Sequence, residues 1–258
     1  MQVVENKNEQ LKLYPAWDVE TRVFHWVNFL CVLGLIAIGL IILNSKALGI
    51  SGDAKILLKT IHVYMGYIFI LNLVVRIVWG FYGNKFVRWK EVLPYGKVYW
   101  SSFANYVKSI TKKSRPEYLG HNPIARLIVS VFFVLLILEG ITGLILAGTD
   151  LYMPPLGHEI AEWVTGSGED HSKLEGLEPG SKEKVDPEAY EQMRKFRKPI
   201  VTVHLFVFYS LLVVIILHIV GVVTGELTEK SGLTSAMFTG KKLFSKEPID
   251  IDKQKKTE

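Results

Sequence analysis

Residues 200–223 read IVTVHLFVFYSLLVVIILHIVGVV, an apolar stretch without a single Lys, Arg, Asp or Glu. At a rise of ~1.5 Å per residue, a helix of this length crosses the ~30 Å hydrocarbon core of a bilayer. Three further apolar blocks of similar length lie at residues 23–43, 61–81 and 127–147. Since 49% of the 258 residues are hydrophobic, the sequence predicts an all-α fold, an integral membrane four-helix bundle forming one domain over residues 1–258.

Basic residues are concentrated in two of the polar segments. The segment between the second and third blocks contains eight Lys or Arg residues from Lys85 to Arg115, and the tail from Lys230 to Lys256 contains seven. The segment between the third and fourth blocks, residues 149–199, is acidic on balance. Because loops rich in Lys and Arg stay in the cytoplasm, we expect both termini there and the 149–199 loop in the periplasm. The pattern predicts a multi-pass protein of the bacterial inner membrane, in contact with lipid, that does not bind nucleic acid.

The loops also contain amphipathic segments. In the predicted cytoplasmic loop, aromatic residues such as Trp89, Tyr99 and Trp100 alternate with lysines, which is typical of a helix lying on a membrane surface. In the predicted periplasmic loop, a shorter amphipathic segment runs from His158 to Val164 and precedes a stretch rich in Gly, Glu, Lys and Pro. We therefore expect amphipathic surface helices in both loops.

Four of the seven histidines, His25, His62, His204 and His218, lie in or at the ends of the apolar blocks. Ionisable side chains inside a bilayer are costly and usually functional. His204 and His218 are fourteen residues apart, which places them on one helix face and ~21 Å apart along the axis. The expected topology places His25 near the cytoplasmic side with His218, and His62 near the periplasmic side with His204. The sequence thus predicts two histidine pairs at two depths.

Two bis-histidine sites in a helix bundle suit two b-type haems, because imidazole is a common axial ligand of haem iron and bundles build cofactor sites from facing helices. Zinc is a poorer fit, since neither depth offers a third or fourth ligand. Two other functions remain open. A transporter with a proton path would also place His, Arg and the mid-helix Glu139 in the membrane, and a haem-free anchor would need no ligands.

Three arginines, Arg22, Arg76 and Arg126, lie at the predicted cytoplasmic ends of the first three helices. A guanidinium binds a carboxylate through charge-assisted hydrogen bonds, so each of them is a candidate partner for a haem propionate. The alternative is that they anchor the helices by the rule that positive residues stay inside.

Several short motifs follow one another in a definite order. They are Arg22-x-x-His25-Trp26, Arg76-x-x-Trp79-x-x-x-Gly83-Asn84, Tyr118-Leu119-Gly120-His121-Asn122-Pro123, Thr142-Gly143, and the spacing of Met237, Gly240 and Phe244 after His218. In this order the chain resembles the b-type cytochrome subunit of membrane-bound nickel–iron hydrogenases, within the bacterial four-helix di-haem cytochrome b superfamily. The similarity covers most of the chain.

The resemblance implies two haems b, ligated in the pairs His25/His218 and His62/His204, with a quinone as the lipid-side substrate. We expect the quinone at His121 and Asn122, which offer hydrogen bonds, and the ordinary pKa of histidine suits proton exchange near neutrality. The sequence Asn122-Pro123 also matches a helix N-cap and first turn, and the two roles are compatible. The protein would be an electron-transfer subunit without catalytic residues of its own.

The resemblance also implies a periplasmic redox partner. The 149–199 loop is longer and more acidic than is usual in hydrogenase cytochromes, so the partner is a hydrogenase-like oxidoreductase or a multihaem c-type cytochrome. We expect it to carry positive charge and to dock on acidic residues of this loop, namely Asp150, Glu159, Glu162, Glu169, Asp170, Glu175 and Glu178.

Overall fold

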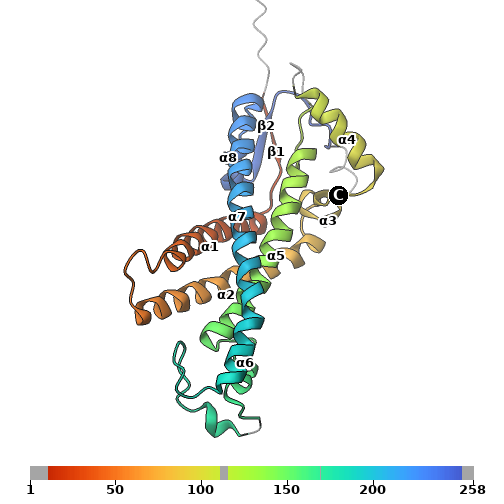
Figure 1. Cartoon of the computed structure of the whole chain (residues 1–258). Helices are drawn as coiled ribbons and strands as arrows, with labels where there is room; N and C mark the ends of the chain where they lie inside the picture. The colour runs from red at the N-terminus through yellow and green to blue at the C-terminus, as the bar shows by residue number, and fades with distance from the viewer. Residues whose placement is uncertain (1–10, 111–115, 169, 252–258) are drawn as a thin grey trace, which may run out of the picture. The chain divides into compact units, whose positions relative to one another are not determined.

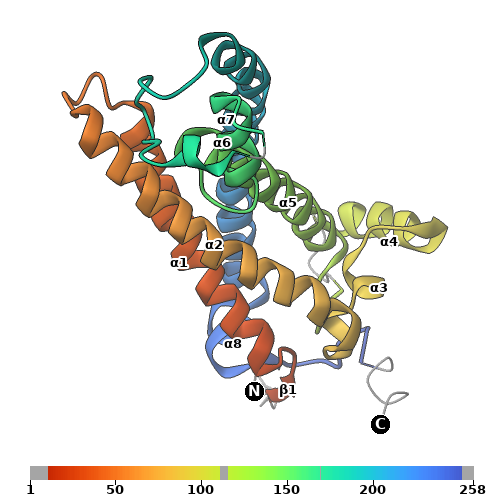
Figure 2. The same cartoon turned by 90° about the horizontal axis from the view of Figure 1, so that it is seen from below.

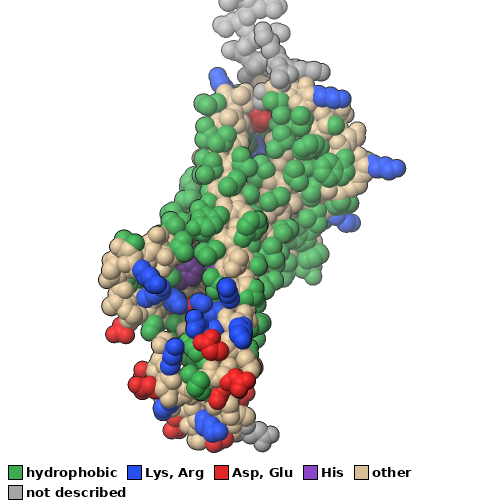
Figure 3. All heavy atoms as spheres, in the orientation of Figure 1, with side chains coloured by type: hydrophobic (Ala, Val, Ile, Leu, Met, Phe, Trp, Pro, Cys, Tyr) green, Lys and Arg blue, Asp and Glu red, His purple; other side chains and the backbone are tan. Residues whose placement is uncertain are grey.

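Four long helices dominate the structure, a computed structural model that describes residues 11–110, 116–168 and 170–251 (Figure 1). All four are long and apolar enough to cross a membrane, and few residues of their apolar stretches are buried in protein. Figure 3 shows hydrophobic side chains over much of the exposed surface, as expected for helices that contact lipid. The prediction of four membrane helices is confirmed, and their bounds are α1 Val19–Leu43, α2 Gly52–Tyr82, α5 Pro123–Leu151 and α7 Pro187–Glu229.

Helix α7 begins earlier than the sequence predicts. The carboxylate of Asp186 caps the helix by accepting a hydrogen bond of 2.8 Å from the backbone N–H of Ala189. Pro187 occupies the first helical position, where the absence of its N–H removes no hydrogen bond of the helix. The helix then continues through Pro199, the last residue of the predicted loop. The expected loop of residues 149–199 is therefore shorter, because α5 runs to Leu151 and α7 begins at Pro187.

The chain divides into two compact units. Unit 1 comprises residues 1–25, 75–133 and 214–258, and unit 2 comprises residues 26–74 and 134–213. The boundaries between these segments fall within all four long helices, so each of these helices contributes to both units.

Unit 1 contains a small sheet that an all-helical prediction did not include. Strands β1 (Lys12–Pro15) and β2 (Lys241–Phe244) pair antiparallel, side by side in Figure 1, with Lys12 opposite Phe244. The core beside the sheet is formed by Ala16, Phe86, Leu119 and Phe244. This pairing brings the first and the last strand of the described chain together.

A cluster of hydrogen bonds in unit 1 gives a structural role to Trp79 and Asn84, two residues of the motif that runs from Arg76 to Asn84. The carboxylate of Asp18 accepts hydrogen bonds from the indole of Trp79 at 3.0 Å and from the backbone N–H of Asn84 at 3.1 Å. Burial alone would raise the pKa of Asp18, but these bonds and those from Thr21 outweigh it, and the pKa is lowered. Trp79 and Asn84 thus fix the chain just before α1 to the end of α2.

The segment between α2 and α5 forms three short helices, η1 (Lys85–Val87), α3 (Trp89–Val92) and α4 (Gly96–Ser109). Helix α4 buries Tyr99, whose hydroxyl donates to the carbonyl of Pro123 at 2.9 Å, and exposes Val98 and Trp100. The expected amphipathic helix is therefore present, and its position on a membrane surface stays a prediction.

In unit 2, two short helices lie between α5 and α7. Helix α6 (Gly157–Thr165) packs its apolar face, with Ile160 and Val164, against Met193 in the first turns of α7 (Figure 2). The chain leaves α6 through Gly166, whose φ of +60° suits glycine, and then forms η2 (His171–Leu174).

Candidate functional site

Two of the four membrane histidines belong to unit 1. His25 lies on α1 and His218 on α7. The ring of Phe132 packs edge-on against His218, with centroids 5.6 Å apart. That these two histidines bind the same haem stays a prediction.

The other two histidines belong to unit 2. His62 lies on α2 and His204 on α7. The hydroxyl of Thr142 lies 2.9 Å from Nδ1 of His204, and Glu139 Oε1 lies 3.3 Å from its Nε2. Nδ1 of His62 is buried without a hydrogen-bond partner among the described residues. A buried, unsatisfied imidazole nitrogen calls for an explanation, and a metal ion is one.

Glycines surround this second pair. A Cβ added to Gly39 would lie 3.4 Å from Cε1 of His62, and one added to Gly143 would lie 3.7 Å from Cε1 of His204. At Gly66, one helical turn after His62, an added Cβ would meet no protein atom within 4 Å. Small residues beside both imidazoles and the unsatisfied nitrogen of His62 fit a flat, iron-containing macrocycle such as haem.

Arg76 is the arginine best placed to bind an anion. It is buried in unit 1, where its Nη2 donates to the carbonyl of Val87 at 3.1 Å and its guanidinium lies between 5.3 and 5.7 Å from three aromatic rings. Its Nη1 is buried and has no hydrogen-bond partner in the described part of the chain. One donor of a buried cation therefore remains available for a carboxylate.

Arg22 and Arg126 have partners within the protein. Arg22 donates to the carbonyls of Phe238 and of Asp18. Nη2 of Arg126 donates to the carbonyl of Leu93 at 2.6 Å, and its guanidinium lies 5.0 Å from the ring of Tyr99. Both side chains thus make contacts within unit 1, and Nε of Arg126 is buried without a partner among the described residues.

His121 does not meet the expectation of proton exchange near neutrality. Its ring packs on Trp17, with centroids 4.8 Å apart. Burial lowers the pKa of His121 to about 3, and the charges of Lys242, Arg76 and Arg126 act in the same direction. Because the imidazole is neutral at pH 7, it offers a hydrogen bond rather than a proton.

The segment that carries His121 is held by the C-terminal part of the chain. The carboxylate of Asp250 accepts from the backbone N–H groups of Leu119 and Gly120 at 2.7 and 2.8 Å. Lys242, whose pKa burial lowers to about 8 against the opposing effect of Asp250, donates to the carbonyl of Gly120 at 3.1 Å. Oδ1 of Asn122 accepts from the N–H of Ala125 at 2.8 Å. The expected N-cap of the third helix is therefore confirmed.

The acidic residues expected to dock a partner differ in their surroundings. The mostly buried carboxylate of Asp150 binds Lys59 and Arg197, so it is not available for docking, contrary to the prediction. Glu162 lies between two histidines, and Glu169 lies outside the described residues. The acidic residues that remain exposed are Glu159, Asp170, Glu175 and Glu178.

Comparisons with known proteins agree with these features. The family model for prokaryotic cytochrome b561 matches residues 16–240. The probable Ni/Fe-hydrogenase B-type cytochrome subunit of Rhodobacter capsulatus is 23% identical over 248 residues, which cover 91% of this chain and 83% of the relative. The protein of the same name from Rhizobium leguminosarum bv. viciae is 24% identical over 250 residues, 93% and 92% of the two chains.

A third relative, the probable Ni/Fe-hydrogenase 1 B-type cytochrome subunit of Escherichia coli, is 28% identical over 148 residues, which cover 54% of this chain and 63% of the relative. No solved structure shows a significant match. Because the family model covers most of the sequence, the chain belongs to the prokaryotic cytochrome b561 family.

Proposed function

We propose that this protein is a di-haem b-type cytochrome that transfers electrons between a periplasmic redox partner and quinone in the bacterial inner membrane. The observation that carries the proposal is the grouping of the membrane histidines, His25 with His218 in unit 1 and His62 with His204 in unit 2. Membership of a b-type cytochrome family supports haem b as the cofactor. When bound, each haem supplies a one-electron redox centre.

Two haem-free functions compete with this proposal. A transporter would use His, Arg and Glu139 as a proton path, and a passive anchor would use none of these residues. Neither function requires histidines in two separate pairs. The haem content of the purified protein distinguishes the three functions, because the proposal requires two b-type haems per chain and the alternatives require none.

The residues around His204 would orient it as a ligand. Thr142 lies 2.9 Å from Nδ1, so Nε2 would be the nitrogen that binds iron, in place of its contact with Glu139. Hydrogen bonds of this kind to the second ring nitrogen fix the orientation of metal-binding histidines. In unit 1, Arg76 would bind a haem propionate through its free Nη1, with Arg22 and Arg126 as further candidates.

The proposed topology places the sheet of β1 and β2 in the cytoplasm. The pairing of β1 with β2 supports a position of both strands on one side of the membrane, and the Lys- and Arg-rich segments favour the cytoplasm as that side. Helix α6 and the exposed acidic residues then face the periplasm. In Figure 3, acidic and basic side chains gather over this part of unit 2.

We place the quinone at His121 and Asn122. The neutral imidazole of His121 can donate one hydrogen bond to a quinone carbonyl, and Nδ2 of Asn122 can donate another while its Oδ1 caps α5. Since the pKa of His121 is about 3, protons for the reduced quinone come from another group.

Changing His121 to Ala should slow quinone-linked electron transfer about tenfold, the equivalent of one lost hydrogen bond of ~1.4 kcal/mol in the transition state. Both haems should be retained. Stopped-flow oxidation of a quinol by the purified protein measures the rate. Because His121 is neutral, the wild-type rate should show no step due to this residue between about pH 5 and 8.

Asn122→Asp is the matched variant for the second hydrogen bond. It keeps the capping oxygen and the shape of the side chain but removes the amide donor, so the helix should stay capped while turnover falls. Normal turnover in both His121→Ala and Asn122→Asp would contradict this site and favour a quinone site near the haem that we assign to His62 and His204.

The names of the relatives suggest a hydrogenase as the partner, and a multihaem c-type cytochrome is the alternative. Either would meet the exposed carboxylates Glu159, Asp170, Glu175 and Glu178. A positively charged partner is attracted by these groups, and salt screens the attraction.

The rate of electron transfer to a positively charged partner should therefore fall as ionic strength rises. The double charge reversal Glu175→Lys, Glu178→Lys should lower the second-order rate about tenfold at low salt. Glu20→Lys, an exposed residue on the proposed cytoplasmic side, is the matched control and should leave the rate unchanged. A rate that responds neither to salt nor to the double reversal would exclude docking on this surface.

A further inference from the structure

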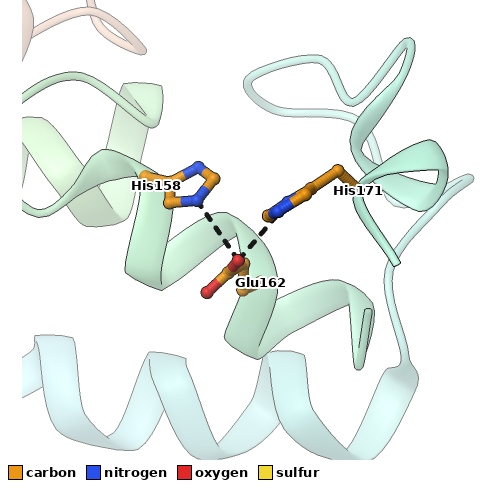
Figure 4. A group of neighbouring side chains, drawn as sticks. All are labelled: His158, Glu162 and His171. Carbon is orange, nitrogen blue, oxygen red and sulfur yellow. Dashed lines mark ion pairs between the residues drawn. The ribbon is translucent and has the colours of Figure 1, made fainter. Parts of the chain in front are cut away.

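Three side chains in the loop between α5 and α7 converge on one point. His158 and Glu162 lie on the exposed side of α6, and His171 is the first residue of η2 (Figure 4). Oε1 of Glu162 lies 3.2 Å from Nε2 of His158 and 3.6 Å from Nδ1 of His171. The three ligand atoms all lie within 4.8 Å of one another.

The local fold explains why these residues meet. Residues four apart on a helix share a face, and α6 buries the opposite face, with Ile160 and Val164, against Met193. After Gly166 ends α6, Asp170 caps η2 by accepting from the N–H of Ser172 at 3.2 Å. The chain is thereby folded back so that the ring of His171 lies 5.4 Å from that of His158.

We propose that His158, Glu162 and His171 bind a divalent transition-metal ion, with zinc as the best match. Zinc binds nitrogen and carboxylate ligands at ~2.1 Å in tetrahedral geometry, which places neighbouring ligand atoms ~3.4 Å apart. The two contacts of Glu162, 3.2 and 3.6 Å, bracket this value. Two histidines and one glutamate form a known zinc ligand set, whereas magnesium and calcium prefer oxygen ligands.

The side chains are placed for an ion that arrives from solvent. Those of His158 and His171 are 60% and 65% exposed, and that of Glu162 is 30% exposed. A fourth coordination position is therefore open to water. The bound ion would link α6 to η2 and fix the segment between them. This site is independent of the proposed haem sites, since the three residues lie outside the long helices.

The competing explanation is a simple ion pair between Glu162 and protonated histidines. Isothermal titration of the full-length, detergent-solubilised chain separates the two, after removal of any polyhistidine tag and treatment with a chelator. We expect one zinc ion to bind with a Kd on the order of 1 µM, and no comparable binding of magnesium.

Three variants test the assignment of the ligands. Glu162→Gln, His158→Gln and His171→Asn should each weaken zinc binding at least about tenfold, because each removes one of three ligands. Glu159→Gln is the matched control, since Glu159 is an exposed carboxylate of the same helix outside the cluster. Binding that is equal in the wild type and the three variants, or equally weakened by the control, would overturn the proposal.

Copper provides a second measurement that does not depend on affinity. Cu²⁺ binds such sites more tightly than zinc, and its paramagnetic resonance spectrum reports the number of coordinated nitrogens. The wild type should show two imidazole nitrogens and His171→Asn should show one. Identical spectra for the two proteins would place the ion elsewhere and contradict the site.

Discussion

Replacing His204 with alanine should leave the purified protein with one b-type haem per chain instead of two, and replacing His62 should remove the same haem. These two residues belong to the same compact unit, and we propose that each supplies one axial ligand. A bis-histidine haem that loses one ligand also loses its low-spin state and much of its affinity. Pyridine haemochrome spectra measure the stoichiometry, and a redox titration identifies which haem remains.

The same reasoning pairs His25 with His218, so their alanine variants should retain the haem that the first two variants lose. His158→Ala is the matched control, because this exposed histidine lies outside the long helices and should leave both haems in place. The pairing would be wrong if the His62 and His25 variants lacked the same haem. The haem assignment itself would be wrong if all four variants kept two.

Asp150→Asn should lower the free energy of unfolding by about 3 kcal/mol, because it leaves two partly buried cations without their counter-ion. The carboxylate of Asp150 is 13% exposed and binds both Lys59 and Arg197, with Arg197 Nη2 donating at 2.9 Å. This contact connects α2, α5 and α7 within unit 2. Thermal unfolding of the variant in detergent, followed by the loss of helical circular dichroism, measures the effect.

The matched control is Glu191→Gln, which breaks an exposed ion pair with Arg194 of 2.9 Å. Surface pairs contribute little, so the change should stay within ~0.5 kcal/mol. Adding Lys59→Met to Asp150→Asn should recover part of the loss, because one unpaired cation is removed. Equal effects of Asp150→Asn and Glu191→Gln would show that the buried contact does not stabilise the unit.

The parts of the fold that depend on local hydrophobic pattern could be predicted from the sequence, and those that depend on distant contacts could not. All four apolar blocks are helices. The start of α2 was placed too late because Asp53, Lys55 and Lys59 interrupt the apolar pattern without interrupting the helix. The pairing of Lys12 with Phe244 does not affect the hydrophobic pattern around either residue, so the sequence pattern could not predict it.

The same distinction between local pattern and distant contacts applies to the candidate site. Depth and spacing, which are properties of single helices, predict two histidine pairs. The members of each pair belong to one compact unit, and their pairing as haem ligands stays a prediction. The buried state of Asp150 and the low pKa of His121 depend on side chains far away in the sequence, such as Arg197 and Lys242. The sequence analysis does not predict the cluster of His158, Glu162 and His171, although the spacing of His158 and Glu162 on one helix face was a usable signal. The approach of His171 was not predictable, because it depends on the path of a loop.

The pairing of β1 with β2 has a consequence for biosynthesis. Strand β1 is the first described element to leave the ribosome and β2 is the last, so at ~5–20 residues per second β1 waits roughly 10–45 s for its partner. Every segment of unit 2 has been translated by residue 213, whereas unit 1 needs the chain beyond β2. Although His25 is the earliest of the four membrane histidines to be made, it belongs to the unit whose translation is completed last.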